Sequence, residues 1–213
     1  MKTCTVFCAG QFHGLVAPVE PQELIIAADG GLEHLKELNM TPTVILGDFD
    51  SLGYVPEGAR VFPVEKDDTD SMLAVRYGLT VGCDRFILYG ALDGPRPDHT
   101  VANLQTLQFL ADHGAAGYLV GKDFVVTVLK NGLITFPKET EGILSVFCLG
   151  AAADGVTIEG LKYTLTDGML TPGFPLGVSN HFVGKMATVR VRDGSLILFY
   201  PRKAGIVPCL PMN

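Results

Sequence analysis

Short apolar runs alternate with amphipathic helical patterns over residues 1–120, and this alternation restricts the first part of the chain to few architectures. The runs that we expect to form strands are Thr5–Ala9, Leu24–Ala28, Val44–Leu46, Arg60–Val64, Arg85–Tyr89 and Gly117–Val120. The helices that we expect between them are Gly31–Leu38, Ser71–Leu79 and Thr100–Asp112. Strands that alternate with helices are typical of a largely parallel sheet, in which each helix leads from one strand to the next.

The pattern changes near Gly121 to Asp123, after which strand-like runs are separated by turn residues. The clearest runs are Val125–Leu129, Leu144–Cys148, Ala187–Val191 and Leu196–Tyr200. Hairpin-type turns are expected at Asn131-Gly132, Asp154-Gly155, Asp167-Gly168 and Asp193-Gly194. We therefore expect a Rossmann-like α/β domain at residues 1–122 and an all-β sandwich domain at residues 123–213.

The composition excludes several classes of protein. A net charge of −7 argues against nucleic acid as a partner, because nonspecific nucleic-acid binding depends on clustered Lys and Arg. The longest apolar stretch, near Leu144 to Ala153, is shorter than the roughly 20 residues that span a bilayer. The five cysteines contain no CxxC pair, and the first residues do not read as a signal peptide. We expect a cytoplasmic protein without a membrane span or disulfides.

Aspartates follow the predicted strands of the first domain at the points where those strands end. They are Asp29, Asp48 and Asp50, Asp67, Asp68 and Asp70, and Asp93 and Asp98. Ligands of parallel α/β sheets collect at the carboxyl ends of the strands, because the following loops and helix N-termini converge there. We therefore expect these side chains to face one edge of the sheet.

Several carboxylates in one place favour a metal site. Two unit charges about 5 Å apart repel by roughly 3 kcal/mol at an effective dielectric constant near 20, and a hard cation removes that repulsion. Mg²⁺ prefers oxygen ligands, usually one or two carboxylates together with waters and phosphate oxygens. If Gly47–Ser51 is extended, Asp48 and Asp50 point to one side and Phe49 points into the fold.

Each aspartate also has an ordinary structural explanation, since Asp often caps helices and starts turns. Asp68 and Thr69 could cap the helix that begins at Ser71, and Asp98 could cap the helix that follows. That explanation has to account for four strand ends at once. We therefore favour the metal site.

The segment Gly94-Pro95-Arg96-Pro97-Asp98-His99 adds a cation to these carboxylates. A guanidinium group can hold phosphate oxygens with two hydrogen bonds, and two prolines stiffen the loop around Arg96. The alternative is a surface arginine paired with Asp93 or Asp98. The chain contains neither GxxxxGK[ST] nor GxGxxG, so neither a P-loop kinase nor a dinucleotide dehydrogenase is indicated.

Five ordered segments resemble the thiamine pyrophosphokinase family. They are Ala28-Asp29-Gly30-Gly31, Gly47-Asp48-Phe49-Asp50-Ser51, Lys66-Asp67-Asp68-Thr69-Asp70, Arg96-Pro97-Asp98-His99-Thr100-Val101-Ala102-Asn103-Leu104 and Gly177-Val178-Ser179-Asn180. The resemblance implies conversion of thiamine and ATP to thiamine diphosphate and AMP. It also implies a homodimer with active sites formed between subunits.

The resemblance assigns roles to individual residues. Catalytic roles fall to Asp48, Asp70, Arg96 and Asp98, and Mg²⁺ binding to Asp48, Asp50 and Asp70. Nucleotide binding falls to Asp29, Asp50, Asp67, Thr69 and Arg96, and thiamine binding to Ser179, Asn180 and Asp98. Without the resemblance, Gly177–Asn180 reads as an ordinary β turn.

Three features depart from the family pattern. Pro95 stands where a second glycine is common, His181 stands where an acidic residue often follows Ser-Asn, and the chain has no tryptophan to stack on thiamine. The aromatic candidates for that contact are Phe174, Phe182 and Tyr163. Two other functions remain open at this point. One is a diphosphokinase acting on a different alcohol, such as a pterin, and the other is a nucleotide- or thiamine-sensing module without turnover.

Overall fold

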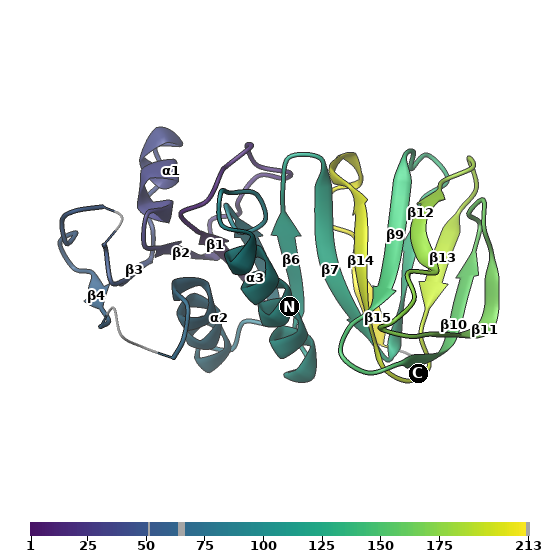
Figure 1. Cartoon of the computed structure of the whole chain (residues 1–213). Coiled ribbons are helices and arrows are strands. Elements are labelled where there is room, and N and C mark those ends of the chain that lie inside the picture. The colour runs from purple at the N-terminus through teal and green to yellow at the C-terminus, as the bar shows by residue number, and fades with distance from the viewer. Residues whose placement is uncertain (51, 64–66, 212–213) are drawn as a thin grey trace. The chain divides into compact units, whose positions relative to one another are not determined.

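The computed structural model describes residues 1–50, 52–63 and 67–211 (Figure 1). The chain divides into two compact units, Met1–Lys122 and Asp123–Asn213. The first unit is α/β and the second is built of antiparallel strands, which confirms the predicted fold class. Within the described ranges, every helix lacks the combination of length and apolar character that crossing a membrane requires.

The first unit contains a parallel sheet with the strand order β6-β5-β1-β2-β3-β4. The strands are β1 (Thr3–Phe7), β2 (Leu24–Ala28), β3 (Val44–Gly47), β4 (Arg60–Val61), β5 (Arg85–Tyr89) and β6 (Ala116–Val120). Every residue of the central strand β1 is buried, as expected for a strand covered on both faces. The predicted strand Arg60–Val64 is reduced to two exposed residues, and Val64 lies outside the described residues.

Within the described part of this unit, three helices pack on the sheet, and they are α1 (Gly31–Glu37), α2 (Asp70–Thr80) and α3 (Pro97–Asp112). Figure 1 shows α2 and α3 side by side, and the two helices are in contact. The helix α3 begins three residues earlier than predicted because Pro97 occupies its first turn, where a proline leaves no intrahelical hydrogen bond unmade. Leu107 and Leu110 form its buried face.

The second unit contains two groups of antiparallel strands. One has the order β12-β9-β14-β7, and the other is a five-stranded sheet with the order β11-β10-β13-β8-β15. The strands are β7 (Phe124–Lys130), β8 (Gly132–Phe136), β9 (Ile143–Cys148), β10 (Ala153–Glu159), β11 (Leu165–Leu170), β12 (Gly177–His181), β13 (Ala187–Arg190), β14 (Ser195–Pro201) and β15 (Cys209–Pro211), and a short 3-10 helix follows β14 (Arg202–Ala204).

Aromatic side chains join the two layers of the second unit. Phe136 of β8 lies 5.2 Å, between ring centroids, from Tyr200 of β14 in the facing sheet. Phe182 contacts the same Phe136 ring edge-on, also at 5.2 Å. Phe136 and Tyr200 are fully buried, so the predicted sandwich has a closed core at this point.

Two of the four predicted hairpins are wrong, because the chain changes sheets there instead. Asn131 separates β7 from β8, which pair with different strands, and Asp193-Gly194 separates β13 from β14 in the same way. The two corners are bonded to each other, since the Gly194 amide donates to Asn131 Oδ1 at 2.9 Å. The turn residues correctly predict that the chain turns at these two points, but they do not reveal which strands pair.

The other two predicted hairpins are also wrong, because both lie within strands. Gly155 has a φ of 65° inside β10, and Asp167 has a φ of 46° inside β11. The pairing of these two strands shifts register on both sides of Val156. A left-handed residue at such a shift is typical of a β-bulge.

We predict that Gly31→Ala destabilises the first unit. A Cβ atom at Gly31 would lie 1.9 Å from the carbonyl oxygen of Phe7, so α1 would have to move away from β1. The expected loss in the free energy of unfolding is about 2 kcal/mol, measured by urea denaturation. Gly94→Ala is the control, because a Cβ atom there meets nothing within 4 Å. Equal stability of the two variants would contradict this packing constraint.

Candidate active site

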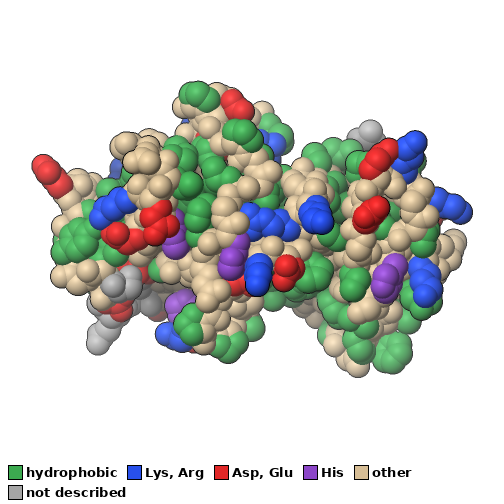
Figure 2. Space-filling model, turned by 90° about the horizontal axis from the view of Figure 1, so that it is seen from above, with side chains coloured by type: hydrophobic (Ala, Val, Ile, Leu, Met, Phe, Trp, Pro, Cys, Tyr) green, Lys and Arg blue, Asp and Glu red, His purple; other side chains and the backbone are tan. Residues whose placement is uncertain are grey.

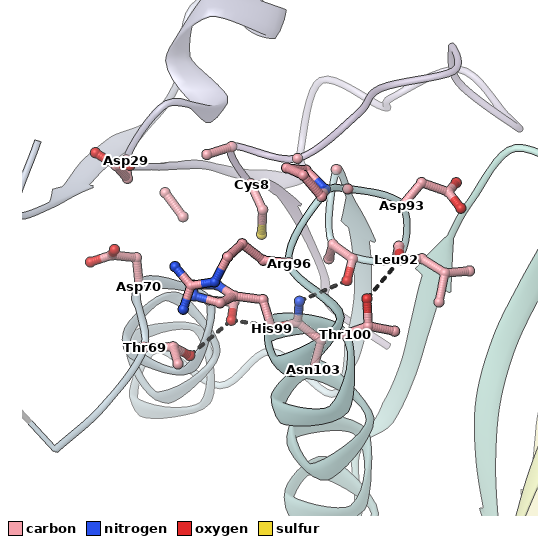
Figure 3. Close-up of a pocket in the computed structure, with 18 of the residues that line it drawn as sticks. Cys8, Asp29, Thr69, Asp70, Leu92, Asp93, Arg96, His99, Thr100 and Asn103 are labelled. Atoms are coloured by element: carbon pink, nitrogen blue, oxygen red, sulfur yellow. Dashed lines mark hydrogen bonds between the residues drawn. The ribbon is translucent and has the colours of Figure 1, made fainter. Parts of the chain in front are cut away.

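A cavity of about 720 Å³ opens at the carboxyl ends of the parallel strands in the first unit. Loops after β1, β2, β3 and β5 line it, together with the N-termini of α2 and α3. Figure 3 shows Asp29, Asp70 and Arg96 reaching it from three different elements. In the space-filling view, acidic, basic and histidine side chains lie close together on one face of the molecule (Figure 2).

The carboxylates of Asp29, Asp48 and Asp50 form an acidic cluster at this cavity. One oxygen from each lies within 4.8 Å of the others. Asp29 is buried, Asp48 is partly exposed and Asp50 is exposed, so the cluster extends from the sheet edge into solvent. Three carboxylate oxygens at this spacing suit a hard divalent cation better than any soft metal.

The backbone that brings these carboxylates together is left-handed, which corrects the expected extended geometry. Phe49 has a φ of 59° and Asp29 a φ of 50°. Asp48 Oδ1 accepts a hydrogen bond from the Asp50 amide at 3.3 Å, so the segment after β3 turns back on itself. The Phe49 side chain is buried as predicted, and its burial holds a conformation that is strained for a bulky residue.

Asp70 lines the same cavity from the first turn of α2, outside the acidic cluster. Thr69 is the N-cap of this helix, and its hydroxyl accepts a hydrogen bond from the Met72 amide at 3.2 Å. The capping explanation is therefore right for Thr69. Asp68 also lines the cavity and forms an ion pair with Arg76 at 3.1 Å.

The structure does not bring Asp67 and Asp98 into the lining of this cavity. Asp67 is exposed before α2. Asp98 lies in the first turn of α3 and accepts hydrogen bonds from Arg96 Nε at 3.0 Å and Nη2 at 2.6 Å. The Arg96 guanidinium lines the cavity while holding the Asp98 carboxylate beside it.

The Arg96 guanidinium sets the charge state of Asp98. Its hydrogen bonds are the main cause that lowers the pKa of Asp98 to about 2. Both side chains are exposed to solvent, where such ion pairs are weak and exchange partners readily. An anion that competes for Arg96 would therefore release Asp98.

Several cavity residues were not singled out from the sequence as site residues. Cys8, His99 and Asn103 line the cavity because the loops and helices that carry them converge at the sheet edge. Burial, followed by the negative charge of Asp70, raises the pKa of the Cys8 thiol to about 12. Cys8 is thus a neutral thiol and an unsuitable nucleophile. The helical period of the sequence could have placed Asn103 on α3, but it could not have shown that the Asn103 side chain bonds to Ser71.

The second unit carries Ser179 and Asn180 on β12. Ser179 is exposed, and its amide donates to Ser145 Oγ at 3.0 Å from a left-handed backbone with a φ of 56°. Asn180 is buried, and its side chain binds the backbone of Tyr163, accepting from its amide at 2.9 Å and donating to its carbonyl at 2.6 Å. Asn180 therefore fixes the position of Tyr163.

The three aromatic candidates for a stacking contact differ in their exposure to solvent. Phe182 packs against Phe136 in the core, whereas Tyr163 and Phe174 are largely exposed. Tyr163 borders a cavity of about 110 Å³ and Phe174 one of about 130 Å³. Tyr163 and Phe174 are thus free to contact a ligand.

We predict that Arg96→Gln raises the pKa of Asp98 from about 2 toward the ordinary value near 4, because the carboxylate loses its cationic donor. An NMR titration of the Asp98 carboxyl carbon measures this shift. Arg192→Gln is the control, because Arg192 lowers the pKa of a different carboxylate, Asp154. A pKa of Asp98 that stays near 2 in Arg96→Gln would refute the pairing.

Comparison with known proteins identifies the family. Residues 19–116 match the model of the thiamin pyrophosphokinase catalytic domain, and residues 133–196 match the model of the thiamin pyrophosphokinase vitamin B1 binding domain. A thiamine pyrophosphokinase of Bacillus subtilis is 26% identical over 210 residues, which are 93% of this chain and 98% of the relative.

Solved structures share the fold over almost the whole chain. The crystal structure of thiamine pyrophosphokinase from Bacillus subtilis aligns with a TM-score of 0.82 at 24% identity, covering 94% of this chain and 99% of that one. The corresponding protein from Geobacillus thermodenitrificans aligns with a TM-score of 0.77 at 24% identity, covering 93% and 97%. The two domain matches together span most of the sequence and confirm the resemblance seen in the motifs. The chain belongs to the thiamin pyrophosphokinase family.

Proposed function

We propose that the chain transfers a diphosphate group from ATP to the hydroxyl group of thiamine, giving thiamine diphosphate and AMP. The observation that carries this proposal is the acidic cluster of Asp29, Asp48 and Asp50 in the same cavity as Asp70 and Arg96. Carboxylates beside a guanidinium group suit a metal-bound polyphosphate. The names of the relatives supply the acceptor, thiamine.

Mg²⁺ fits the acidic cluster, because the cluster offers only carboxylate oxygens as ligands. Asp48, Asp50 and Asp70 would hold it, with Asp29 beside them, and bound Mg²⁺ would neutralise charge on the phosphate oxygens. The buried Asp29 fixes one side of the site, since its amide donates to Leu46 O at 2.8 Å. Thr69 and the cap of α2 hold the nucleotide-binding segment that carries Asp70.

Arg96 and Asp98 have separate roles in the transfer step, which are charge stabilisation and proton acceptance. The thiamine oxygen forms a bond to the β-phosphorus of ATP, the bond from that phosphorus to the bridging oxygen of the α-phosphate breaks, and AMP leaves with the electron pair. Arg96 stabilises the charge on the transferred group. Asp98 is a very weak base while it is paired, so it can accept the hydroxyl proton only after phosphate draws Arg96 away.

Thiamine binding belongs to the second unit in this proposal. Ser179 is exposed and available for a polar contact, whereas the Asn180 side chain acts through the backbone of Tyr163. Tyr163 and Phe174 replace the absent tryptophan as aromatic surfaces. Asp67 is the weakest of the nucleotide-binding assignments, because it lies outside the cavity lining.

Assembly as a homodimer with sites between subunits is part of the same proposal. Large apolar side chains remain exposed on β11, β12 and the adjoining loops of the second unit, and they are Tyr163, Met169, Phe174, Leu176, Val178, Val183 and Met186. Tyr163, Leu176 and Val178 border one cavity, and exposed apolar side chains that lie together are typical of protein contacts. Analytical ultracentrifugation should give a dimer, and an active species that is strictly monomeric would contradict sites between subunits.

The proposed reaction predicts thiamine-dependent release of AMP from ATP and Mg²⁺. The second product should have the mass of thiamine diphosphate. ADP together with thiamine monophosphate would keep the site but replace diphosphate transfer by phosphate transfer. Turnover only with a different alcohol, such as a pterin, would change the acceptor. ATP binding without turnover would indicate a sensor.

Loss of one metal-site carboxylate should reduce turnover without unfolding the chain. We expect Asp50→Asn and Asp70→Asn to lower kcat about 100-fold, because each removes charge that holds the metal and triphosphate. The exposed Glu57 lies outside the cavity, so Glu57→Gln is a matched control with unchanged kcat. Near-normal turnover of Asp70→Asn at saturating Mg²⁺ would remove Asp70 from the metal site.

A further inference from the structure

A chain of side-chain hydrogen bonds runs along the cavity wall from α2 to the loop after β5. Asn103 of α3 is 6% exposed, and its Nδ2 donates to the carbonyl oxygen of Ala91 at 2.7 Å. Its Oδ1 accepts from Ser71 Oγ of α2 at 2.6 Å. Ser71 Oγ lies 3.0 Å from Thr69 Oγ1. Figure 3 shows Asn103 and Thr69 joined through this chain.

Each proton in the chain has one position. The Ala91 carbonyl can only accept, so the Asn103 amino group faces it and the Asn103 oxygen faces Ser71. Ser71 donates its only proton to that oxygen, and the Thr69 hydroxyl must therefore donate to Ser71. Thr69 in turn accepts from the Met72 amide at 3.2 Å. A chain in which every donor points the same way is reinforced by mutual polarisation.

This chain ties together the two walls of the cavity that carry the charged residues of the proposed site. Asp70 lies between Thr69 and Ser71, so both of its neighbours are held. The other end of the chain holds Ala91, in the loop that leads to Arg96. The relative position of the Asp70 backbone and that loop therefore depends on Asn103.

We propose that Asn103 is a positioning residue that, through Ser71, fixes Asp70 relative to the wall that carries Arg96. The proposal rests on the proposed function, since Asp70 and Arg96 both act there on the same triphosphate. A purely structural role for this hydrogen-bond chain would affect unfolding without affecting metal–nucleotide binding. A positioning role affects both, because small displacements of charged groups in an active site have large effects on rate.

Three variants and one control separate the two roles. Ser71→Ala and Asn103→Ala each break the link between α2 and α3, and the double variant removes both ends of their shared bond. Thr106→Val is the control, because Thr106 is 1% exposed on the same helix and its hydroxyl donates to Ala102 O at 3.0 Å within α3. It loses a buried hydroxyl without disconnecting the cavity walls.

Each variant is measured by thermal unfolding, by kcat at a temperature where it is fully folded, and by calorimetric binding of Mn²⁺ with α,β-methylene-ATP. We expect Ser71→Ala and Asn103→Ala to lower kcat about 10- to 100-fold and to weaken binding of the Mn²⁺–nucleotide complex. The double variant should lose no more than Asn103→Ala alone, because the two residues act through one bond. Thr106→Val should lower only the unfolding temperature.

Two results overturn the proposal. One is unchanged kcat and binding in Ser71→Ala and Asn103→Ala despite a lower unfolding temperature, and the other is an equal loss of kcat and binding in Thr106→Val. Nucleotide binding and turnover, measured for the unaltered chain and for the variants, distinguish failure of the positioning role from failure of the proposed function. If the unaltered chain binds Mn²⁺ with the nucleotide but forms no thiamine diphosphate, weakened binding in the variants still supports positioning. If the chain is active and the variants match it in kcat and in binding, the reaction stands and positioning falls.

Discussion

Mutual repulsion among the carboxylates of Asp29, Asp48 and Asp50 is the constraint on which the rest of the first unit depends. Their oxygens lie within 4.8 Å of one another, at which distance unit charges repel by roughly 3 kcal/mol at an effective dielectric constant near 20. The parallel sheet supplies the force that opposes this repulsion, because β2 and β3 are held in register and buried. A bound cation would remove the repulsion and make the cluster favourable.

Local backbone strain gives the cluster its shape. Asp29 and Phe49 both have left-handed backbones, and the buried Phe49 ring prevents the segment after β3 from relaxing. On the other side of the cavity, the hydrogen-bond chain through Asn103 likewise restrains the backbone, because it holds α2 against α3. Charged groups on short loops thus derive their precision from the buried residues that pack against or bond to those loops.

The sequence was sufficient for the features that depend on local pattern. Leu24–Ala28 and Arg85–Tyr89 form strands with the predicted bounds, and aspartates that follow strands meet at one edge because the sheet is parallel. The sequence did not predict the features that depend on which strands pair or on where a side chain points. Asn131 marks a change of sheet rather than a hairpin, and neighbouring residues alone do not encode that choice. The sequence left open whether Arg96 pairs with an aspartate, and Asp98 pairs with Arg96 instead of lining the cavity.

The most direct test of the central claim is to locate the metal itself. Crystals grown with Mn²⁺ and α,β-methylene-ATP, measured at a wavelength where manganese scatters anomalously, would show its position independently of any assay. The peak should lie within ligand distance of the Asp48 and Asp50 carboxylates, with the triphosphate between them and Arg96. A nucleotide bound in this cavity with the manganese peak elsewhere, or with no peak, would contradict the assignment of the acidic cluster as the metal site.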